Sequence, residues 1–112
     1  MDNLSDKANL AEKRLSKEQV RKLLTHILKS SGDISFTDYA EKRMLERGIT
    51  VQTVVNVLER GKVYDGEEYH YGSYRQWRYR VETTRYRIVV TFQIKDEVLV
   101  INAIDFKGHL AE

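Results

Sequence analysis

Apolar residues in the first third of the chain recur at the spacing of an amphipathic helix. Steps of three and four align them on one face. These residues are Val20, Leu23, Leu24, Ile27 and Leu28. The preceding "SKEQ" forms a capping box, in which Ser16 and Gln19 bond to each other's backbone amides. The pattern predicts a helix that begins after Ser16 and stops at Gly32.

Two shorter helices are predicted after a short extended segment, "ISF". The first begins at Thr37 or Asp38 and ends at Gly48, and the second begins after Thr50 and ends at Gly61. The positions predicted to face inward are Ala40, Met44 and Leu45 in the first helix and Val51, Val54, Val55 and Leu58 in the second.

The second half of the chain has the alternation typical of strands. In residues 74–82, Trp77, Tyr79 and Val81 share one face. The other face carries Gln76, Arg78 and Arg80. Two further strands are predicted at residues 86–94 and 98–106, and the last is apolar on both faces, as in a central strand. Turns are predicted at Asp65-Gly66, Thr83-Thr84 and Lys95-Asp96.

This order predicts an α+β domain in which N-terminal helices pack on one face of an antiparallel β-meander. The 112 residues suffice for a single compact domain. Within it, residues 1–31 are expected to form an N-terminal helical extension of the α+β unit at residues 32–112.

Composition narrows the functional classes. Charged residues make up 32% of the chain, but the net charge is only +2, so an argument for nucleic-acid binding depends on local clustering. The absence of Cys excludes disulfides and thiolate sites. No apolar stretch is long enough to span a membrane, and the protein is expected to be cytoplasmic.

The local cluster is "YRQWRYRVETTRYR", residues 74–87, with five arginines and one acid, Glu82. If the aromatic face packs on the helices, Arg78 and Arg80 point away from the core, and Arg85 and Arg87 on the next strand join them. Like charges side by side repel, so the cluster is suited to an anion such as phosphate, which the arginine fork binds through two oxygens. The alternative is a solvated sheet face on which each arginine pairs with a nearby acid.

The remaining residues offer little cofactor chemistry. The sequence has no metal-ligand spacing, no phosphate-binding glycine loop and no nucleophile elbow, so no cofactor and no metal are expected. Metal-free RNA cleavage needs only a base, an acid and cations that stabilise the phosphate. His70 and Tyr74 are candidates for proton transfer, and Arg80 for stabilising the phosphate.

The stretch "ISFTDYAEKRMLERGITVQTVVNVLERGKV" resembles the domain of unknown function 4258 family, whose members carry T-x-H-A, R-M-x-E-R-G-I and G-x-V patterns. The resemblance extends from Ile34 to Lys107. It implies a relationship to RelE/ParE-like toxins, which place helices on an antiparallel sheet. Many RelE-like members are metal-free mRNA endoribonucleases neutralised by a cognate antitoxin, whereas ParE-like relatives act on gyrase.

One position departs from the family pattern, because Tyr39 stands where the family has histidine. Either the phenol replaces that histidine, or the position is structural, with the ring packed beneath the sheet. Arg43 and Arg47, in the same motif, lie four residues apart on one helix face. They are expected either to touch substrate or to fasten the helix through Glu46 or another acid.

The first hypothesis is therefore a RelE-like toxin of a toxin–antitoxin system that cuts mRNA, free or ribosome-bound, without a metal. It assigns catalysis to His70, Tyr74 and Arg80. It assigns substrate binding to Lys62, Arg78, Arg85, Arg87, Arg43 and Arg47. The second is a non-catalytic RelE-like module that binds nucleic acid or protein. The third is an inhibitor or immunity-like protein whose acidic loop "YDGEEYHYG" contacts a basic partner.

Overall fold

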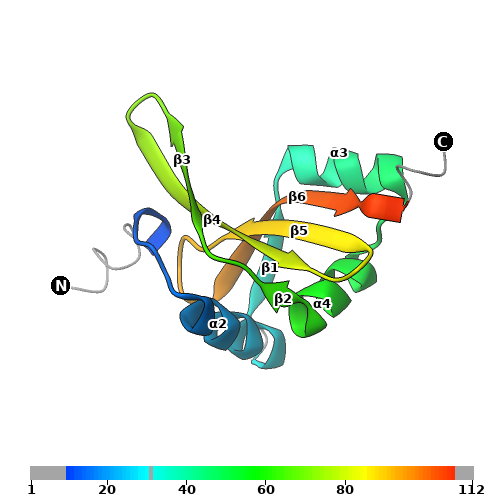
Figure 1. The fold of residues 1–112 in the computed structure, drawn as a ribbon, viewed down its shortest axis with the longest axis horizontal. Coiled ribbons are helices and arrows are strands. Elements are labelled where there is room, and N and C mark those ends of the chain that lie inside the picture. Colours follow the sequence, from blue (N-terminus) through cyan, green and yellow to red (C-terminus); the bar gives the residue numbers. More distant parts are fainter. Residues whose placement is uncertain (1–9, 31, 108–112) are drawn as a thin grey trace.

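The fold is that of a computed structural model, which describes residues 10–30 and 32–107. The first of its helical elements is a short 3-10 turn, η1 (Leu10–Glu12). The helices are α2 (Lys17–Lys29), α3 (Asp38–Arg47) and α4 (Val51–Arg60). The strands are β1 (Asp33–Phe36), β2 (Lys62–Val63), β3 (Glu67–Tyr71), β4 (Tyr74–Glu82), β5 (Tyr86–Thr91) and β6 (Glu97–Asp105). Figure 1 shows their arrangement. The expected N-terminal extension lies partly outside the described residues.

The strands form one curled sheet in the order β1-β6-β5-β4-β2, with β3 paired to β4 as a protruding hairpin. The expected α+β class is confirmed, but the sheet is not a purely antiparallel meander. The segment "ISF" belongs to β1, which pairs in parallel with β6, Ile34 opposite Val98. Parallel pairing is available here because most of the domain lies between the two strands and provides the long crossover that it needs.

The three helices begin at the predicted caps. The Ser16 hydroxyl accepts from the Gln19 amide at 3.1 Å, and the Gln19 side chain accepts from the Ser16 amide at 2.8 Å. Thr37 and Thr50 cap α3 and α4 in the same manner, through the amides three residues on. Gly48 ends α3 in the left-handed region, at φ 67°, where a side chain is strained.

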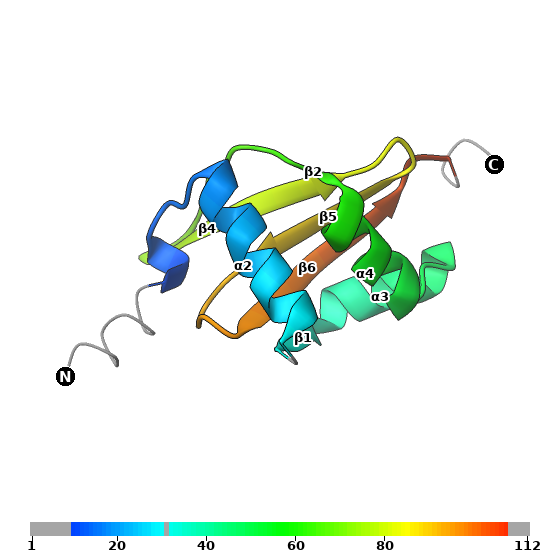
Figure 2. The same cartoon turned by 90° about the horizontal axis from the view of Figure 1, so that it is seen from below.

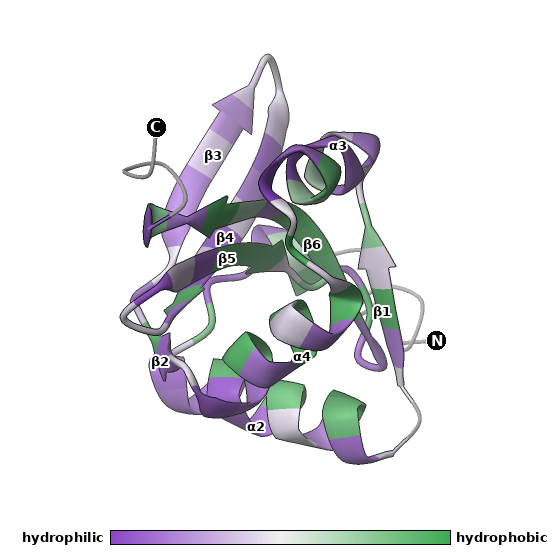
Figure 3. Ribbon diagram, turned by 90° about the vertical axis from the view of Figure 1, so that its right-hand side faces the viewer, coloured by the Kyte–Doolittle hydropathy of each residue, from purple (hydrophilic) through white to green (hydrophobic). Residues whose placement is uncertain are grey.

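Helices α2 and α4 lie across one face of the sheet, the helix-covered face (Figure 2). Their buried residues are Val20, Leu24 and Ile27 from α2 and Val54, Val57 and Leu58 from α4. Val51 was predicted to face inward, but it lies in the first turn of α4 and is 53% exposed. Hydropathy follows the same division, because apolar residues gather where the strands face these helices, and the β3 arm is largely hydrophilic (Figure 3).

Helix α3 covers a sheet edge rather than a face. Strand β1 pairs with β6 only as far as Phe36, and beyond that point the Arg47 guanidinium donates to the carbonyl of Ala103 at 2.8 Å. Covering an edge protects its unpaired backbone groups. Ala40 and Met44 are buried as predicted, but Leu45 is not. Leu45 lies on the outer side of the helix and is 86% exposed.

The strands show two differences from prediction. Strand β3 was expected to be a loop, because its five residues are all exposed and give no apolar alternation. Residues 67–71 form a strand because they pair with β4, with Tyr69 opposite Gln76. In addition, β5 ends at Thr91 rather than continuing to Ile94. The predicted central position of the last strand is confirmed, since β6 lies between β1 and β5.

The turn between β4 and β5 contains neither Gly nor Asn. Thr83 supplies the closure instead, because its hydroxyl accepts from the amides of Arg85 and Tyr86 at 3.3 and 3.1 Å. A Ser or Thr hydroxyl that accepts hydrogen bonds from backbone amides can close a turn without the positive φ that Gly or Asn would supply. The turn is therefore one residue longer than predicted, with Thr83, Thr84 and Arg85 between the strands.

Tyr79 joins the N-terminal segment to the core. Its ring is 2% exposed and packs on Phe92, with 5.9 Å between ring centroids. Its hydroxyl accepts from the Leu15 amide at 2.8 Å and lies 3.4 Å from the Lys13 carbonyl. Burial raises the pKa of Tyr79 above its ordinary value of 10.0, against smaller lowering effects of the Leu15 amide and Arg14.

Replacing Tyr79 by Phe is expected to lower the free energy of unfolding by about 1 to 2 kcal/mol, because the Leu15 amide loses its acceptor. Equilibrium denaturation at pH 7 measures this change. Tyr71→Phe is the control, since Tyr71 is 75% exposed, and its effect should stay within about 0.5 kcal/mol. Equal stability of the two variants would contradict the anchoring role.

The same tyrosine predicts a pH dependence. Its folded-state pKa lies above the unfolded value, so its contribution is complete below pH 10.0 and is lost as the pH rises through the folded pKa. As the pH rises above 10.0, wild type should therefore lose stability more steeply than Tyr79→Phe. Parallel slopes for the two proteins in denaturation across that range would refute the assignment.

Candidate functional site

A pocket of about 320 Å³ lies on the sheet face opposite α2 and α4, which we call the open face. The protruding hairpin and α3 flank this face (Figure 1). Val89, Asn102 and Ile104 form the pocket floor, and Tyr69 of the hairpin contributes to its wall. Arg78, Arg80 and Arg87 also line it, and we call it the arginine pocket.

The strand registers explain why these residues meet. Arg80 of β4 lies opposite Val89 of β5, which lies opposite Asn102 of β6. The next row across the same strands is Glu82, Arg87 and Ile104. Residues directly opposite in a sheet share a face, so both rows face away from α2 and α4. The predicted common orientation of Arg78, Arg80 and Arg87 is therefore confirmed.

Arg80 and Arg87 share one carboxylate. Oxygen Oε2 of Glu82 lies 2.6 Å from Nε of Arg87 and 3.4 Å from Nη1 of Arg80. The Glu82 side chain is only 14% exposed, whereas each arginine side chain is 31% exposed. Two guanidinium groups thus face one well-shielded anion, which leaves donor groups of both arginines in excess.

Arg80 carries a further unsatisfied donor. Its Nε is buried and makes no hydrogen bond to any described residue. Oxygen Oε2 of Glu67 lies 4.0 Å from this nitrogen, and the Glu67 side chain is 70% exposed. A buried N–H without an acceptor is unfavourable. The arrangement favours an oxygen acceptor close to Arg80, from Glu67 or from a ligand.

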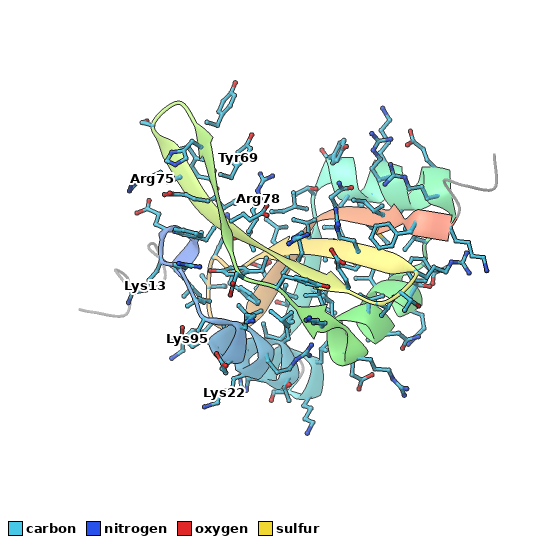
Figure 4. All side chains as sticks on the ribbon, in the orientation of Figure 1. Lys13, Lys22, Tyr69, Arg75, Arg78 and Lys95 are labelled. Carbon is cyan, nitrogen blue, oxygen red and sulfur yellow. The ribbon has the colours of Figure 1, made fainter. Side chains whose placement is uncertain are left out.

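Arg78 is held by neutral groups. Its Nε donates to Oε1 of Gln76 at 2.7 Å, and its guanidinium carbon lies 3.7 Å from the centroid of the Tyr69 ring. Gln76, which is 4% exposed, donates in turn to the Tyr74 hydroxyl at 2.8 Å. Figure 4 shows Tyr69 and Arg78 on the same side of the hairpin. The structure records no carboxylate partner for Arg78 among the described residues.

Lys62 extends the cationic surface along β2. It pairs with Glu82 across the strands and so belongs to the open face. Its ammonium group lies 5.1 Å from the ring centroid of Tyr64, and the Arg80 guanidinium lies 4.8 Å from the same ring. Both distances are within cation–π range, so the ring stabilises the two cations and keeps their side chains close together.

The sequence left two alternatives open: an arginine cluster free to bind an anion, or a sheet face on which each arginine pairs with an acid. The observed charge balance lies between them. The open face around the pocket has four cations, Lys62, Arg78, Arg80 and Arg87, and two nearby carboxylates, Glu67 and Glu82. The excess is two positive charges. Glu68 also borders the pocket, but its carboxylate pairs with His70 at 3.3 Å and Arg75 at 3.4 Å.

The other expected arginines lie elsewhere. Arg85 binds Asp105 through Nε at 3.2 Å and Nη2 at 3.1 Å, and this hydrogen bonding raises the pKa of Arg85. Asp105 is 5% exposed and shares the helix-covered face with Tyr86, which lies opposite it. Arg47 caps the β6 edge, as described above. The structure therefore does not bring Arg85 or Arg47 to the arginine pocket.

Helix α3 keeps Arg43 at its own surface. Arg43 donates to the Tyr39 hydroxyl at 3.0 Å and to Oε1 of Glu46 at 3.0 Å, and the bond to Tyr39 is the main reason for its raised pKa. The Tyr39 ring is 49% exposed, so the expectation that it packs beneath the sheet is wrong. Neither residue borders the pocket.

The proposed proton-transfer residues are separated. His70 lies in β3 rather than in a loop, and alternation places it with Glu68 and Arg75 on the side of the hairpin opposite Tyr69. Figure 4 shows Arg75 on that opposite side. Tyr74 lies near the hairpin tip, 46% exposed, and reaches the pocket only through Gln76 and Arg78.

The sequence did not identify Asn102, which lines the pocket, or Gln76 and Tyr64, which contact its arginines. Gln76 was placed on the correct face, but its burial and its bond to Arg78 depend on the unpredicted strand β3. Asn102 gave a usable signal, because it is a polar residue inside the apolar run "VLVINAI". The position of Tyr64 beside Lys62 and Arg80 had no signal in the local pattern.

Other kinds of site receive no support from the part of the chain that the structure describes. Within residues 10–30 and 32–107, no three His, Asp or Glu side chains are grouped as metal ligands. None of the helices in those ranges has the length and apolar character needed to cross a membrane.

The fold and the site define a small α+β protein with a cationic pocket on the open face of its sheet. The chain belongs to the family described as Domain of unknown function (DUF4258), whose model matches residues 36–105. This range runs from the end of β1 to the end of β6 and includes the whole arginine pocket. No curated protein and no solved structure matches the chain.

Replacing Arg85 by Ala is expected to lower the stability of the fold, because the buried Asp105 carboxylate loses the two hydrogen bonds that the Arg85 guanidinium donates to it. A denaturation midpoint below that of wild type measures the effect. Arg75→Ala is the matched control, since the Arg75 side chain is 60% exposed and lies in the protruding hairpin. Identical midpoints for all three proteins would show that Arg85 has no structural role.

Proposed function

We propose that this protein binds single-stranded RNA at the arginine pocket and acts as a metal-independent endoribonuclease toxin related to the RelE/ParE-like proteins. One observation carries the proposal: three arginines line one pocket, Arg80 and Arg87 share the carboxylate of Glu82, and Arg78 has neutral partners. Guanidinium groups with donors in excess are suited to phosphate oxygens.

The aromatic groups favour RNA over a free anion. Single-stranded nucleic acids are bound by grooves that combine positive charge with aromatic or arginine planes on which bases stack. Tyr69 and Arg78 provide such planes beside Arg80 and Arg87. The pocket is also concave and bordered by a hairpin, and a flexible single strand follows such a surface more readily than a duplex.

The chemistry proposed is cleavage by the neighbouring 2′-hydroxyl. A base removes its proton, the oxygen attacks phosphorus, and the bond to the 5′-oxygen breaks as that oxygen gains a proton. The products are a 2′,3′-cyclic phosphate and a 5′-hydroxyl. In this proposal, Arg80 and Arg87 stabilise the negative charge that develops on the non-bridging phosphate oxygens. Glu67, exposed at the pocket rim, is better placed than His70 to accept a proton.

A second candidate function is RNA binding without cleavage. It is favoured by the position of His70, which lies on the opposite side of the hairpin from the pocket. The third reading, an acidic loop that contacts a basic partner, has less support, because Glu68 is already paired with His70 and Arg75. A cognate antitoxin remains part of the proposal as the partner that neutralises the toxin.

RNA affinity is expected to depend on the pocket arginines and on salt. If three arginines contact phosphates, the logarithm of affinity should fall with the logarithm of salt concentration with a slope of about −2. Arg78→Ala combined with Arg80→Ala should weaken binding at least about tenfold. Fluorescence anisotropy with a labelled single-stranded RNA measures both effects.

Arg75→Ala is the matched control for binding, because it removes an arginine from the same strand on the opposite side of the hairpin. It should leave affinity within about twofold of wild type. Equal losses in the double variant and in the control would show that the chain attracts RNA through general charge and not through the pocket.

Cleavage predicts growth arrest when the protein is expressed. Arrested cells should contain shortened mRNA, and the variant with Arg78→Ala and Arg80→Ala should permit growth at an equal protein level, because it lacks the cations that hold the phosphate. Purified protein with ribosomes and mRNA in a metal chelator tests dependence on ribosomes. Intact mRNA in arrested cells would exclude cleavage and leave the binding function.

A further inference from the structure

The hydrogen-bond donors in the arginine pocket are incompletely used. Arg87 bonds to Glu82 through Nε, and Arg80 through Nη1. Each guanidinium has five N–H donors. Among the described residues, no other hydrogen bond is recorded for either arginine. The Glu82 oxygen therefore marks the point on which both groups converge, and donors remain for a larger anion at the same place.

A tetrahedral phosphate has more acceptor oxygens than the single carboxylate oxygen now shared. Placed between Arg80 and Arg87, it would use the donors that Glu82 leaves unpaired. It would also lie close to the Glu82 charge, and two anions at such a distance repel. Glu82 thus orders the two arginines and at the same time weakens the binding of a second anion.

A flat surface lies beside this anion position. The Arg78 guanidinium covers the Tyr69 ring at 3.7 Å from its centroid, and both groups line the pocket. Arg78 and Arg80 are two residues apart on one strand face, a separation of roughly 7 Å. Val89 and Ile104 provide an apolar floor between β4 and β6. Nucleobases stack on both arginine and tyrosine planes.

Size limits the ligand to one nucleotide. The pocket volume of about 320 Å³ lies at the lower end of small-ligand sites. It is sufficient for one base with its phosphate and too small for a stacked pair of nucleotides. A neighbouring nucleotide of a longer strand would lie outside the pocket.

We infer that the arginine pocket takes one unpaired nucleotide of RNA, with its phosphate bound by Arg80 and Arg87 in competition with Glu82 and its base stacked on Arg78. The inference rests on the proposed function and specifies its ligand. According to this inference, the charge of Glu82 lowers the affinity of the pocket for the nucleotide phosphate. Neutralising Glu82 therefore strengthens binding, although Glu82 contacts Arg80 and Arg87 directly.

The experiment is an NMR titration of the ¹⁵N-labelled full chain with three probes: adenosine 5′-monophosphate, adenosine and inorganic phosphate. The monophosphate should bind at least about tenfold tighter than either part alone, because base and phosphate sites act together. Its signals should shift at Tyr69, Arg78, Arg80 and Arg87. A monophosphate that binds no tighter than phosphate overturns the inference.

Glu82→Gln should tighten monophosphate binding by about three- to tenfold, since the carboxylate charge is removed and the side-chain shape is kept. Adenosine binding should not change. Glu46→Gln is the charge-matched control, because Glu46 lies on α3 and pairs with Arg43 away from the pocket. Unchanged or weaker binding by a folded Glu82→Gln protein overturns the inference, and if that variant does not fold, the wild-type comparison decides.

A single-stranded RNA titrated under the same conditions separates the two proposals. If the RNA binds through the pocket arginines but the monophosphate does not, the one-nucleotide inference fails and RNA binding stands. If neither binds, both fail.

Discussion

Strand β4 is the element on which both the core and the candidate site depend. Its alternation directs Tyr79 and Val81 into the helix-covered core and Arg78 and Arg80 to the open face. The same strand pairs with β2, β3 and β5, so its register also decides which residues of those strands meet the arginines. A shift by one residue would bury the guanidiniums and expose Tyr79, at a large cost in stability.

The open face reduces the repulsion between its arginines and still keeps a net positive charge. Arginines on neighbouring strands repel, and Glu82 reduces this repulsion by bonding to two of them at once. Arg78 is stabilised without a carboxylate, by the Tyr69 ring and by Gln76. The fold therefore tolerates a cationic surface without neutralising it completely. This residual charge is the physical basis of the proposed RNA binding.

The alternation of side chains along the strands predicted the orientation of three pocket arginines, but it did not predict the positions of Arg85 and His70. The common orientation of Arg78, Arg80 and Arg87 was predictable because side chains alternate strictly along a strand. Arg85 was misplaced, since it belongs to a turn closed by Thr83, where alternation does not apply. His70 was expected near the arginines, but pairing between β3 and β4 places it on the opposite side of the hairpin. No local signal reveals that pairing, because β3 is exposed along its whole length.

The sequence by itself determined the helices, their caps, the alternation of β4 and the burial of Tyr79 and Val81, because these depend on neighbours within a few residues. Only the tertiary structure decided the parallel pairing of β1 with β6, the position of α3 at the sheet edge and the hairpin that brings Tyr69 to Arg78. These features join residues that are distant in sequence. Until the whole sheet has formed, the backbone groups and side chains involved have several possible hydrogen-bond and packing partners, so the local sequence does not select one.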